Sequence, residues 1–201
     1  LAHEHGMRFK FVSRTDYRLK DDSLFLDKLK HEFGSYYKLP EGGTNTLAIK
    51  GCQEILQASD SDFDVIGCAV GTGGTIAGII NSSLPKQRVL GFSALKGDFL
   101  KEDIRKFAKN ENWTLVPDYH FGGYAKVNNE LVLFLNEFKE KTTVLLDPIY
   151  TGKMIFGILD MIRKDRFKPR TQILAIHTGG IQGIAGMNQK LKKKNETLIA
   201  I

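Results

Sequence analysis

The feature that most limits the fold is a repeated change from an apolar run to a helical pattern through a glycine-rich turn. Such turns occupy 41–45, 71–75, 150–153 and 177–180. Apolar runs alternating with helical patterns are typical of βαβ units around a mostly parallel sheet, whose strands all end at one edge. One such glycine turn is often only a tight connection. Four at the same edge favour a shared ligand site.

The alternation predicts seven strands and seven helices. The expected strands are Phe9–Ser13, Tyr36–Leu39, Asp64–Val70, Arg88–Ser93, Thr114–Val116, Thr143–Leu146 and Gln172–His177. The expected helices are Ser23–Glu32, Thr46–Ala58, Thr75–Asn81, Leu100–Lys109, Val127–Lys139, Lys153–Arg163 and Ile184–Lys193. An eight-stranded barrel is the alternative to an open sheet with helices on both faces. The glycine turns favour the open α/β sheet.

The turn after the expected strand Asp64–Val70 has the most specific chemistry. Its residues Gly71, Thr72, Gly73, Gly74 and Thr75 place backbone N–H groups and two hydroxyls at the start of a helix. That arrangement suits a phosphate. It is not a dinucleotide fingerprint, because Ile76 occupies the last glycine position, and it lacks the Gly-Lys-Ser/Thr ending of a P-loop. We therefore expect a phosphomonoester of a cofactor or substrate.

Two further turns offer groups suited to a planar ring. Tyr150 precedes a helix at the ligand edge, where it either stacks on a ring or packs over the end of the sheet. Thr178 follows the last strand, and its hydroxyl is available to a ring nitrogen or a phosphate. His177 is expected only to orient its loop. A phosphate cradle, a stacking ring and a hydroxyl together describe a pocket for pyridoxal 5'-phosphate.

Composition excludes several other classes of protein. The net charge of +6 owes half its excess to the end of the chain, since residues 190–201 hold four lysines and one glutamate. We expect a solvated basic tail there and no nucleic-acid partner. No apolar run is long enough to span a membrane, and two cysteines, Cys52 and Cys68, make no disulfide framework. A cytoplasmic location is the expectation.

Five segments resemble one known family. They are 39–45, 70–75, Gly122–Ala125, Asp147–Lys153 and His177–Gly180, in the order that the family has them. The sequence is similar to the family of 1-aminocyclopropane-1-carboxylate deaminase and D-cysteine desulfhydrase. The resemblance implies the tryptophan-synthase-β-like fold, which is fold type II of pyridoxal-phosphate enzymes. It also implies pyridoxal 5'-phosphate as cofactor, a small amino acid as substrate and a homodimer.

The resemblance implies roles for particular residues. It implies that residues 71–75 hold the cofactor phosphate, that Tyr150 stacks on the pyridine ring, that Tyr124 faces the substrate and that Thr178 meets the pyridine nitrogen. Thr151 and Thr178 resemble the desulfhydrase branch. The expected reaction is therefore D-cysteine to pyruvate, ammonia and hydrogen sulfide. Conversion of 1-aminocyclopropane-1-carboxylate to 2-oxobutanoate and ammonia is the alternative.

The sequence also departs from the family. The Gly-Asn-Lys motif with the Schiff-base lysine and the following Ser-Asn-His motif are absent, and Lys153 is assigned to structure rather than to the cofactor. We expect 1–201 to be the later part of a two-lobed enzyme that lacks its N-terminal part; composition does not place the lobe boundary. The chain alone is then expected to be inactive. An inactive fragment or binding remnant is the alternative reading.

A serine hydrolase is a further alternative, since Ser93, Asp147 and His177 come in the chain order of the α/β-hydrolase triad. The segment Gly91–Leu95 lacks the second glycine of the nucleophile elbow. This alternative is therefore the weaker one.

Overall fold

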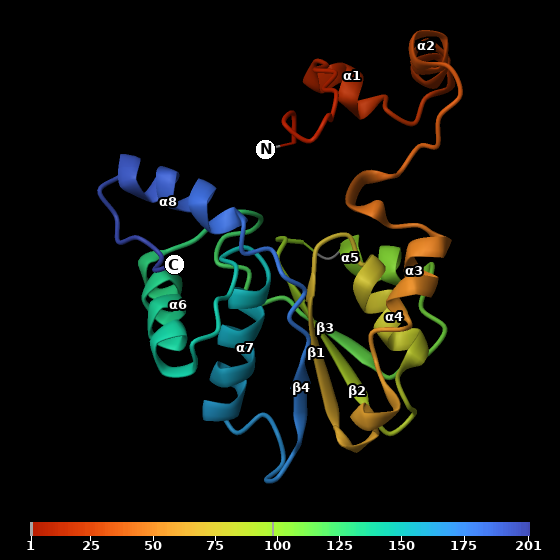
Figure 1. Ribbon diagram of the computed structural model, residues 1–201. Helices are drawn as coiled ribbons and strands as arrows, with labels where there is room; N and C mark the ends of the chain where they lie inside the picture. The colour runs from red at the N-terminus through yellow and green to blue at the C-terminus, as the bar shows by residue number, and fades with distance from the viewer. Residues whose placement is uncertain (1, 98) are drawn as a thin grey trace. The chain divides into compact units, whose positions relative to one another are not determined.

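The computed structural model describes residues 2–97 and 99–201, which form two compact units divided between Leu39 and Pro40 (Figure 1). The first unit contains two helices, α1 (Arg14–Arg18) and α2 (Ser23–Phe33). Each begins with a side-chain cap, because Ser13 accepts from the N–H of Asp16 and Asp22 accepts from the N–H of Leu24. Neither helix buries a residue.

The strands expected at Phe9–Ser13 and Tyr36–Leu39 are wrong, because both segments are irregular. A strand needs a neighbour to accept and donate its ladder hydrogen bonds, and no described residue pairs with either segment. Their apolar side chains face outward in this unit. Phe11 is 93% exposed and Tyr37 is 72% exposed.

The second unit is built on an open, fully parallel sheet in the order β3-β2-β1-β4. Its strands are β1 (Val65–Val70), β2 (Arg88–Ser93), β3 (Trp113–Val116) and β4 (Ile173–Ala175). Val65 is in register with Arg88 on one side and with Ile173 on the other, so β1 is central. The described residues therefore form an open sheet and not a barrel.

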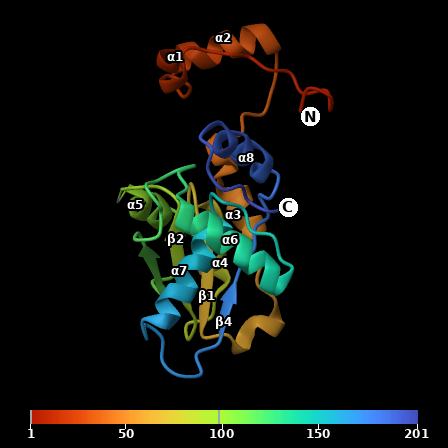
Figure 2. The same ribbon diagram turned by 90° about the vertical axis from the view of Figure 1, so that its left-hand side faces the viewer.

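Helices connect the strands and cover both faces of the sheet (Figures 1 and 2). They are α3 (Thr46–Cys52), α4 (Gly74–Ser82), α5 (Phe99–Arg105), α6 (Asn129–Thr142), α7 (Thr151–Arg163) and α8 (Gly183–Lys193), with short 3-10 helices at Glu41–Gly43 and Ala58–Asp62. The helices expected from the sequence are confirmed, although the helix that begins at Thr46 ends at Cys52 instead of Ala58, and α5 ends at Arg105 instead of Lys109. The segment 143–146 is not a strand: it is irregular, and Thr143 has a left-handed φ of 63°.

The alternation of side chains in β1 determines which helix covers which face. Ile66, Cys68 and Val70 pack with α4 and α5, whereas Val65 and Ala69 pack with α7. Gly67 lies on the α7 face, where a Cβ would come within 2.7 Å of the Cδ1 of Ile158. Burial of all six residues of β1 makes this strand the centre of the core.

Two residues of the basic segment 190–201 are buried, whereas its other ten described residues are exposed. Leu191 and Ile199 are 3% exposed and pack in a second apolar cluster with α6. Asn188 exchanges hydrogen bonds with the backbone of Ile199, and Asn136 of α6 bonds the backbone of Leu198 and Ala200. The lysines of this segment face outward, and so do Leu198 and Ile201, which are 43% and 73% exposed. None of the described helices is long and apolar enough to cross a bilayer.

Candidate functional site

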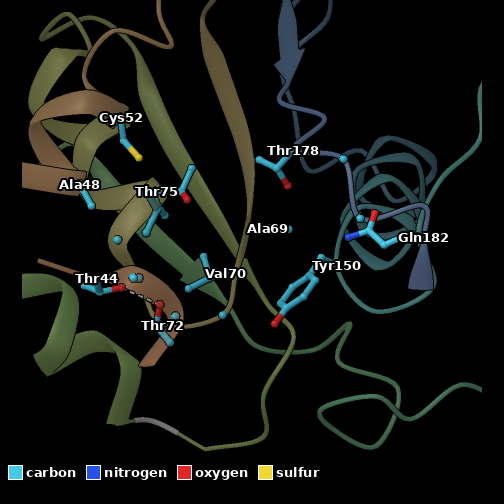
Figure 3. A pocket seen from close by; sticks show the side chains of 18 residues that line it. Thr44, Ala48, Cys52, Ala69, Val70, Thr72, Thr75, Tyr150, Thr178 and Gln182 are labelled. Carbon is cyan, nitrogen blue, oxygen red and sulfur yellow. Dashed lines mark hydrogen bonds between the residues drawn. The ribbon is translucent and has the colours of Figure 1, made fainter. Parts of the chain in front are cut away.

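A cavity of about 370 Å³ lies at the carboxyl end of β1, within the second unit (Figure 3). All four glycine-rich turns of the sequence contribute to it. Its lining residues are Gly42, Gly43, Thr44, Ala48, Cys52, Ala69–Ile76, Tyr150, Thr178–Gly180 and Gln182. The structure thus brings together every predicted cofactor-binding residue: Gly71, Thr72, Gly73, Gly74, Thr75, Tyr150 and Thr178.

The turn between β1 and α4 forms a cradle of backbone groups. Gly73, the N-cap of α4, has a left-handed φ of 91° and gives the helix no side-chain cap. The first N–H groups of a helix have no acceptor within the helix, and the helix dipole makes that end partly positive. The uncapped start of α4 therefore presents backbone donors to the cavity. An anion is the ligand that this arrangement favours.

Close packing around the cradle explains its glycines. A Cβ at Gly73 would lie 2.8 Å from the Cγ1 of Ile104, and one at Gly74 would lie 2.8 Å from the Oγ1 of Thr44. The Oγ1 of Thr44 is also 2.7 Å from the Oγ1 of Thr72 (Figure 3). These two hydroxyls join the 41–45 turn to the cradle. Thr44 was not among the predicted site residues.

Tyr150 forms one wall of the cavity and lies against the cradle. A Cβ at Gly71 would come within 3.1 Å of its ring and within 3.2 Å of its hydroxyl oxygen. Burial first, and then the neighbouring Tyr124, raises the pKa of the Tyr150 phenol to about 12. The ring therefore stays neutral at physiological pH. Its contact with the cradle, rather than with the end of the sheet alone, leaves it available to stack on a planar ligand.

Asp147 holds the turn that carries Tyr150. Its carboxylate is 2% exposed and accepts hydrogen bonds from the N–H groups of Ile149, Tyr150 and Thr151 at 2.7–2.8 Å. The Oγ1 of Thr151 donates to the same carboxylate at 2.6 Å. Thr151 is fully buried and does not line the cavity. The local signal that could have indicated this role is an Asp side chain, which readily accepts hydrogen bonds from backbone N–H groups a few residues on.

Tyr124 lies beside Tyr150 but outside the residues that line the cavity. The two ring centroids are 6.1 Å apart, with an interplanar angle of 58°, and Tyr124 is 55% exposed. A residue at this place can touch a ligand that extends beyond Tyr150. Its predicted contact with substrate remains a prediction.

His177 orients the turn that carries Thr178, as expected. Its Nε2 is 2.8 Å from the carbonyl oxygen of Leu145, and its Nδ1 accepts from the N–H of Gly179. Gly179 and Gly180 have left-handed φ angles of 85° and 87°, and a Cβ at Gly180 would meet the Asp147 side chain at 3.2 Å. Thr178 thereby faces the cavity on the side opposite the cradle (Figure 3).

Gln182 and Cys52 also line the cavity, and the sequence did not single them out for this role. Gln182 precedes α8, and Cys52 ends α3. Neither lies within a glycine motif. Only the folded arrangement of α3 and α8 brings them to the site.

Lys153 takes a structural place, as predicted. Its side chain is 2% exposed, and its Nζ donates to the carbonyl oxygens of His120 and Gly123 at 2.9 Å. Burial lowers the pKa of this ammonium to about 8, against the opposing effect of Asp147. Lys153 does not line the cavity.

The serine-hydrolase alternative is wrong. The Oγ of Ser93 donates to the carbonyl oxygen of Leu95, and the Asp147 carboxylate bonds its own turn. The ring of His177 bonds backbone groups through both nitrogens. A catalytic triad needs a serine-to-histidine and a histidine-to-carboxylate hydrogen bond. The structure shows neither among these three residues.

The sequence is similar to curated proteins that are named for two related activities. It is 32% identical over 209 residues to a Thermotoga maritima protein provisionally named 1-aminocyclopropane-1-carboxylate deaminase, covering 92% of this chain and 65% of that protein. It is 33% identical over 179 residues to the mitochondrial bifunctional D-cysteine desulfhydrase/1-aminocyclopropane-1-carboxylate deaminase of Arabidopsis thaliana, covering 79% of this chain and 45% of that protein. No family model matches the sequence.

Solved structures agree with these relatives. A homologue of 1-aminocyclopropane-1-carboxylate deaminase superposes with a TM-score of 0.77 at 26% identity, over 96% of this chain and 64% of that one. Isoform 2 of threonine deaminase from Solanum lycopersicum superposes with a TM-score of 0.50 at 17% identity, over 81% of this chain and 51% of that one, which is a likeness of fold alone.

The fold and the site define an α/β protein of pyridoxal-phosphate fold type II. The chain is homologous to the family of 1-aminocyclopropane-1-carboxylate deaminases and D-cysteine desulfhydrases, whose members depend on pyridoxal 5'-phosphate. It spans about half to two thirds of the length of the curated relatives compared above.

Proposed function

We propose that the protein to which this chain belongs is a pyridoxal-phosphate-dependent deaminase or lyase that acts on a small amino acid. The observation that carries the proposal is the convergence of four glycine-rich turns on one cavity with an uncapped helix start and a tyrosine ring. A phosphate and a planar ring fit that donor set together. The homologous family supplies the class of reaction.

The cofactor would be held by three groups of this chain. Backbone N–H groups of residues 71–75 would bind its phosphate, the Tyr150 ring would stack on its pyridine, and the Thr178 hydroxyl would meet the pyridine nitrogen. When bound, pyridoxal phosphate supplies an electron sink for bond breaking at the α-carbon of an amino acid. Tyr124, whose ring lies beside that of Tyr150, would face the substrate.

The Thr178 hydroxyl bears on which type of reaction the cofactor would support. A hydroxyl does not stabilise a protonated pyridine nitrogen as a carboxylate does, so elimination is favoured over transamination. We propose D-cysteine as the substrate, which with one water gives pyruvate, ammonia and hydrogen sulfide. Hydrolytic opening of 1-aminocyclopropane-1-carboxylate to 2-oxobutanoate and ammonia is the second candidate. Thr151 supports neither, because its hydroxyl bonds Asp147 away from the cavity.

The amine that joins the cofactor would come from outside this chain. No lysine is among the described residues that line the cavity, and catalysis through a cofactor bound to lysine needs such an amine. Residues 1–201 alone would then bind the cofactor phosphate without turnover. Reduction with borohydride in the presence of the cofactor tests this: stoichiometric labelling of Lys153, with turnover by the isolated chain, would show that the chain uses its own lysine.

Activity is tested on the whole protein with both substrates. D-cysteine is expected to yield sulfide and pyruvate in equal amounts, and a strong preference for 1-aminocyclopropane-1-carboxylate would overturn the assignment of substrate. Thr178→Asp is expected to let pyridoxamine phosphate accumulate during turnover, because a carboxylate stabilises the pyridinium. An unchanged product ratio would show that Thr178 is not the partner of the ring nitrogen.

A homodimer and a cytoplasmic location complete the proposal. The first rests on the resemblance to the family, and the second on two unpaired thiols, Cys52 and Cys68. Sedimentation of the whole protein and cell fractionation test them. A monomer, or enrichment in another compartment, would contradict each in turn.

A further inference from the structure

The loop 119–126 has a backbone that costs free energy. Phe121 and Ala125 have left-handed φ angles of 52°, and Gly122 and Gly123 have φ angles of 92° and 113°. Left-handed backbone is unfavourable for residues that carry a Cβ, so contacts elsewhere must stabilise it. Within the loop, the N–H groups of Gly122 and Gly123 donate to the Nδ1 and the carbonyl oxygen of His120, and the N–H of Lys126 donates to the carbonyl oxygen of Gly123.

Lys153 of α7 bonds this loop, in addition to the edge-to-face contact of Phe121 with Phe156. Its Nζ reaches the carbonyl oxygens of both His120 and Gly123 at 2.9 Å, so one ammonium joins the two ends of the left-handed turn. None of the ion pairs in the described part of the chain involves Lys153, and the nearby Asp147 is bonded to its own turn. A buried ammonium is costly unless its donors are used. Here the carbonyl oxygens of His120 and Gly123, both in one loop, accept hydrogen bonds from the ammonium.

The first turn of α7 is connected to both Tyr150 and Tyr124. Tyr150 is the N-cap of α7, and Lys153 is the third residue of that helix. Tyr124 lies on the loop that Lys153 holds, next to Gly123, and its ring centroid is 6.1 Å from that of Tyr150. The first turn of α7 thus carries Tyr150 and also bonds the loop that carries Tyr124.

We propose that Lys153 is a positioning residue: by holding the carbonyl oxygens of His120 and Gly123, it places Tyr124 beside Tyr150 at the rim of the cofactor cavity. The importance of that rim for a ring-containing ligand rests on the proposed function. The anchoring of the loop does not, because it follows from the hydrogen bonds alone.

Hydrogen exchange of Lys153→Met in the ligand-free chain tests the anchor. Methionine keeps most of the buried side-chain volume and removes all three donors. Amides of residues 120–126 are expected to lose protection by about tenfold to a hundredfold, whereas those of β1 and β2 change by less than about threefold. The control is Lys141→Met, because Lys141 makes only an exposed ion pair with Glu137 on α6. It should leave both regions unchanged.

Two results would overturn the anchor. Unchanged protection of the loop in Lys153→Met would show that the hydrogen bonds do not hold it. Equal loss of protection in β1, β2 and the loop would show that Lys153 supports the whole unit and has no special relation to Tyr124.

Binding of two probes tests the consequence for the site. 4'-Deoxypyridoxine 5'-phosphate has the ring and phosphate but no aldehyde, so it needs no lysine, and inorganic phosphate occupies the cradle alone. Lys153→Met is expected to weaken the first about fivefold to tenfold and to change the second less than twofold. Equal weakening of both contradicts a role at the ring. If the unmodified chain binds neither probe, the proposed cofactor site fails, while hydrogen exchange still decides the anchor.

Discussion

The ring of Tyr150 lies against the α-carbon of Gly71, so closely that a Cβ at position 71 would come within 3.1 Å of the ring and 3.2 Å of its hydroxyl. This contact joins two elements that are far apart in the sequence, the end of β1 and the start of α7. It makes the phosphate cradle and the proposed stacking ring parts of one wall. We expect ligand binding in the cavity to depend on that contact.

Gly71→Ala is expected to push the Tyr150 ring by a few tenths of an ångström and to weaken binding of 4'-deoxypyridoxine 5'-phosphate about threefold to tenfold, because the added Cβ would lie 3.1 Å from the ring, closer than an ordinary van der Waals contact. Isothermal titration calorimetry measures the effect. Gly186→Ala is the matched control, since a Cβ at Gly186 in α8 meets nothing within 4 Å. The control should bind normally and gain about 0.5–1 kcal/mol of stability. Undiminished binding by Gly71→Ala contradicts the stacked arrangement.

Gly78→Ala is expected to destabilise the second unit by about 1–3 kcal/mol. A Cβ at Gly78 in α4 would overlap the Cβ of Cys52 and would lie 2.7 Å from its carbonyl carbon and 2.9 Å from the carbonyl oxygen of Ile49. Backbone atoms of α3 do not move aside cheaply. Urea unfolding measures the change, again against Gly186→Ala. Equal stability of the two variants would show that α3 does not pack this closely on α4.

The two thiols are expected to react very differently with Ellman's reagent. Cys52 lines the cavity, whereas Cys68 is fully buried and burial raises the pKa of its thiol to about 12. One thiol should therefore react in the folded chain and the second only on unfolding. Saturating 4'-deoxypyridoxine 5'-phosphate should slow the first reaction several-fold. Equal reactivity of both thiols, or a rate that the ligand does not change, would contradict the position of Cys52.

Stability is expected to fall as the pH rises above about 9, in part because of Cys68. The unfolded thiol loses its proton near its ordinary pKa of 9.0, whereas the folded thiol keeps it until about pH 12. The folded state then binds more protons than the unfolded state, which costs up to about 1.4 kcal/mol per pH unit in this range. Cys68→Ala removes this contribution.

Urea unfolding of the unmodified chain and of Cys68→Ala, near neutral pH and near pH 10.5, isolates the contribution of the Cys68 thiol to stability. The two proteins share all their other titrating groups. The stability advantage of the unmodified chain over Cys68→Ala should shrink at the higher pH. A difference that does not depend on pH would place the thiol in contact with water.

The sequence predicted those parts of the fold that local pattern determines. The run that became β1 is apolar throughout, and glycines end it at the start of α4, so strand, turn and helix could all be read from adjacent residues. The position of Thr178 beside the cradle followed from the common edge of a parallel sheet, whereas Tyr150 reaches the cradle from a segment that is not a strand.

Long-range contacts set the limits of that prediction. Residues 143–146 have the composition of a strand but lack a ladder partner among the described residues. Ile199 is ordered by Asn188 and, through its neighbours, by Asn136, which no lysine-rich pattern reveals. Thr151 was expected to bear on the choice of substrate, yet the buried Asp147 carboxylate turns its hydroxyl away from the cavity.

The central claim is that the turn after β1 holds the phosphate of a ring-bearing cofactor, and an NMR titration tests it most directly. 4'-Deoxypyridoxine 5'-phosphate added to the ¹⁵N-labelled chain is expected to shift the amides of residues 71–75 most strongly, followed by those of Tyr150 and Thr178. Inorganic phosphate should shift only the first group. Shifts confined to the basic segment 166–170 at the opposite end of the sheet, or no saturable shift at all, would contradict the account.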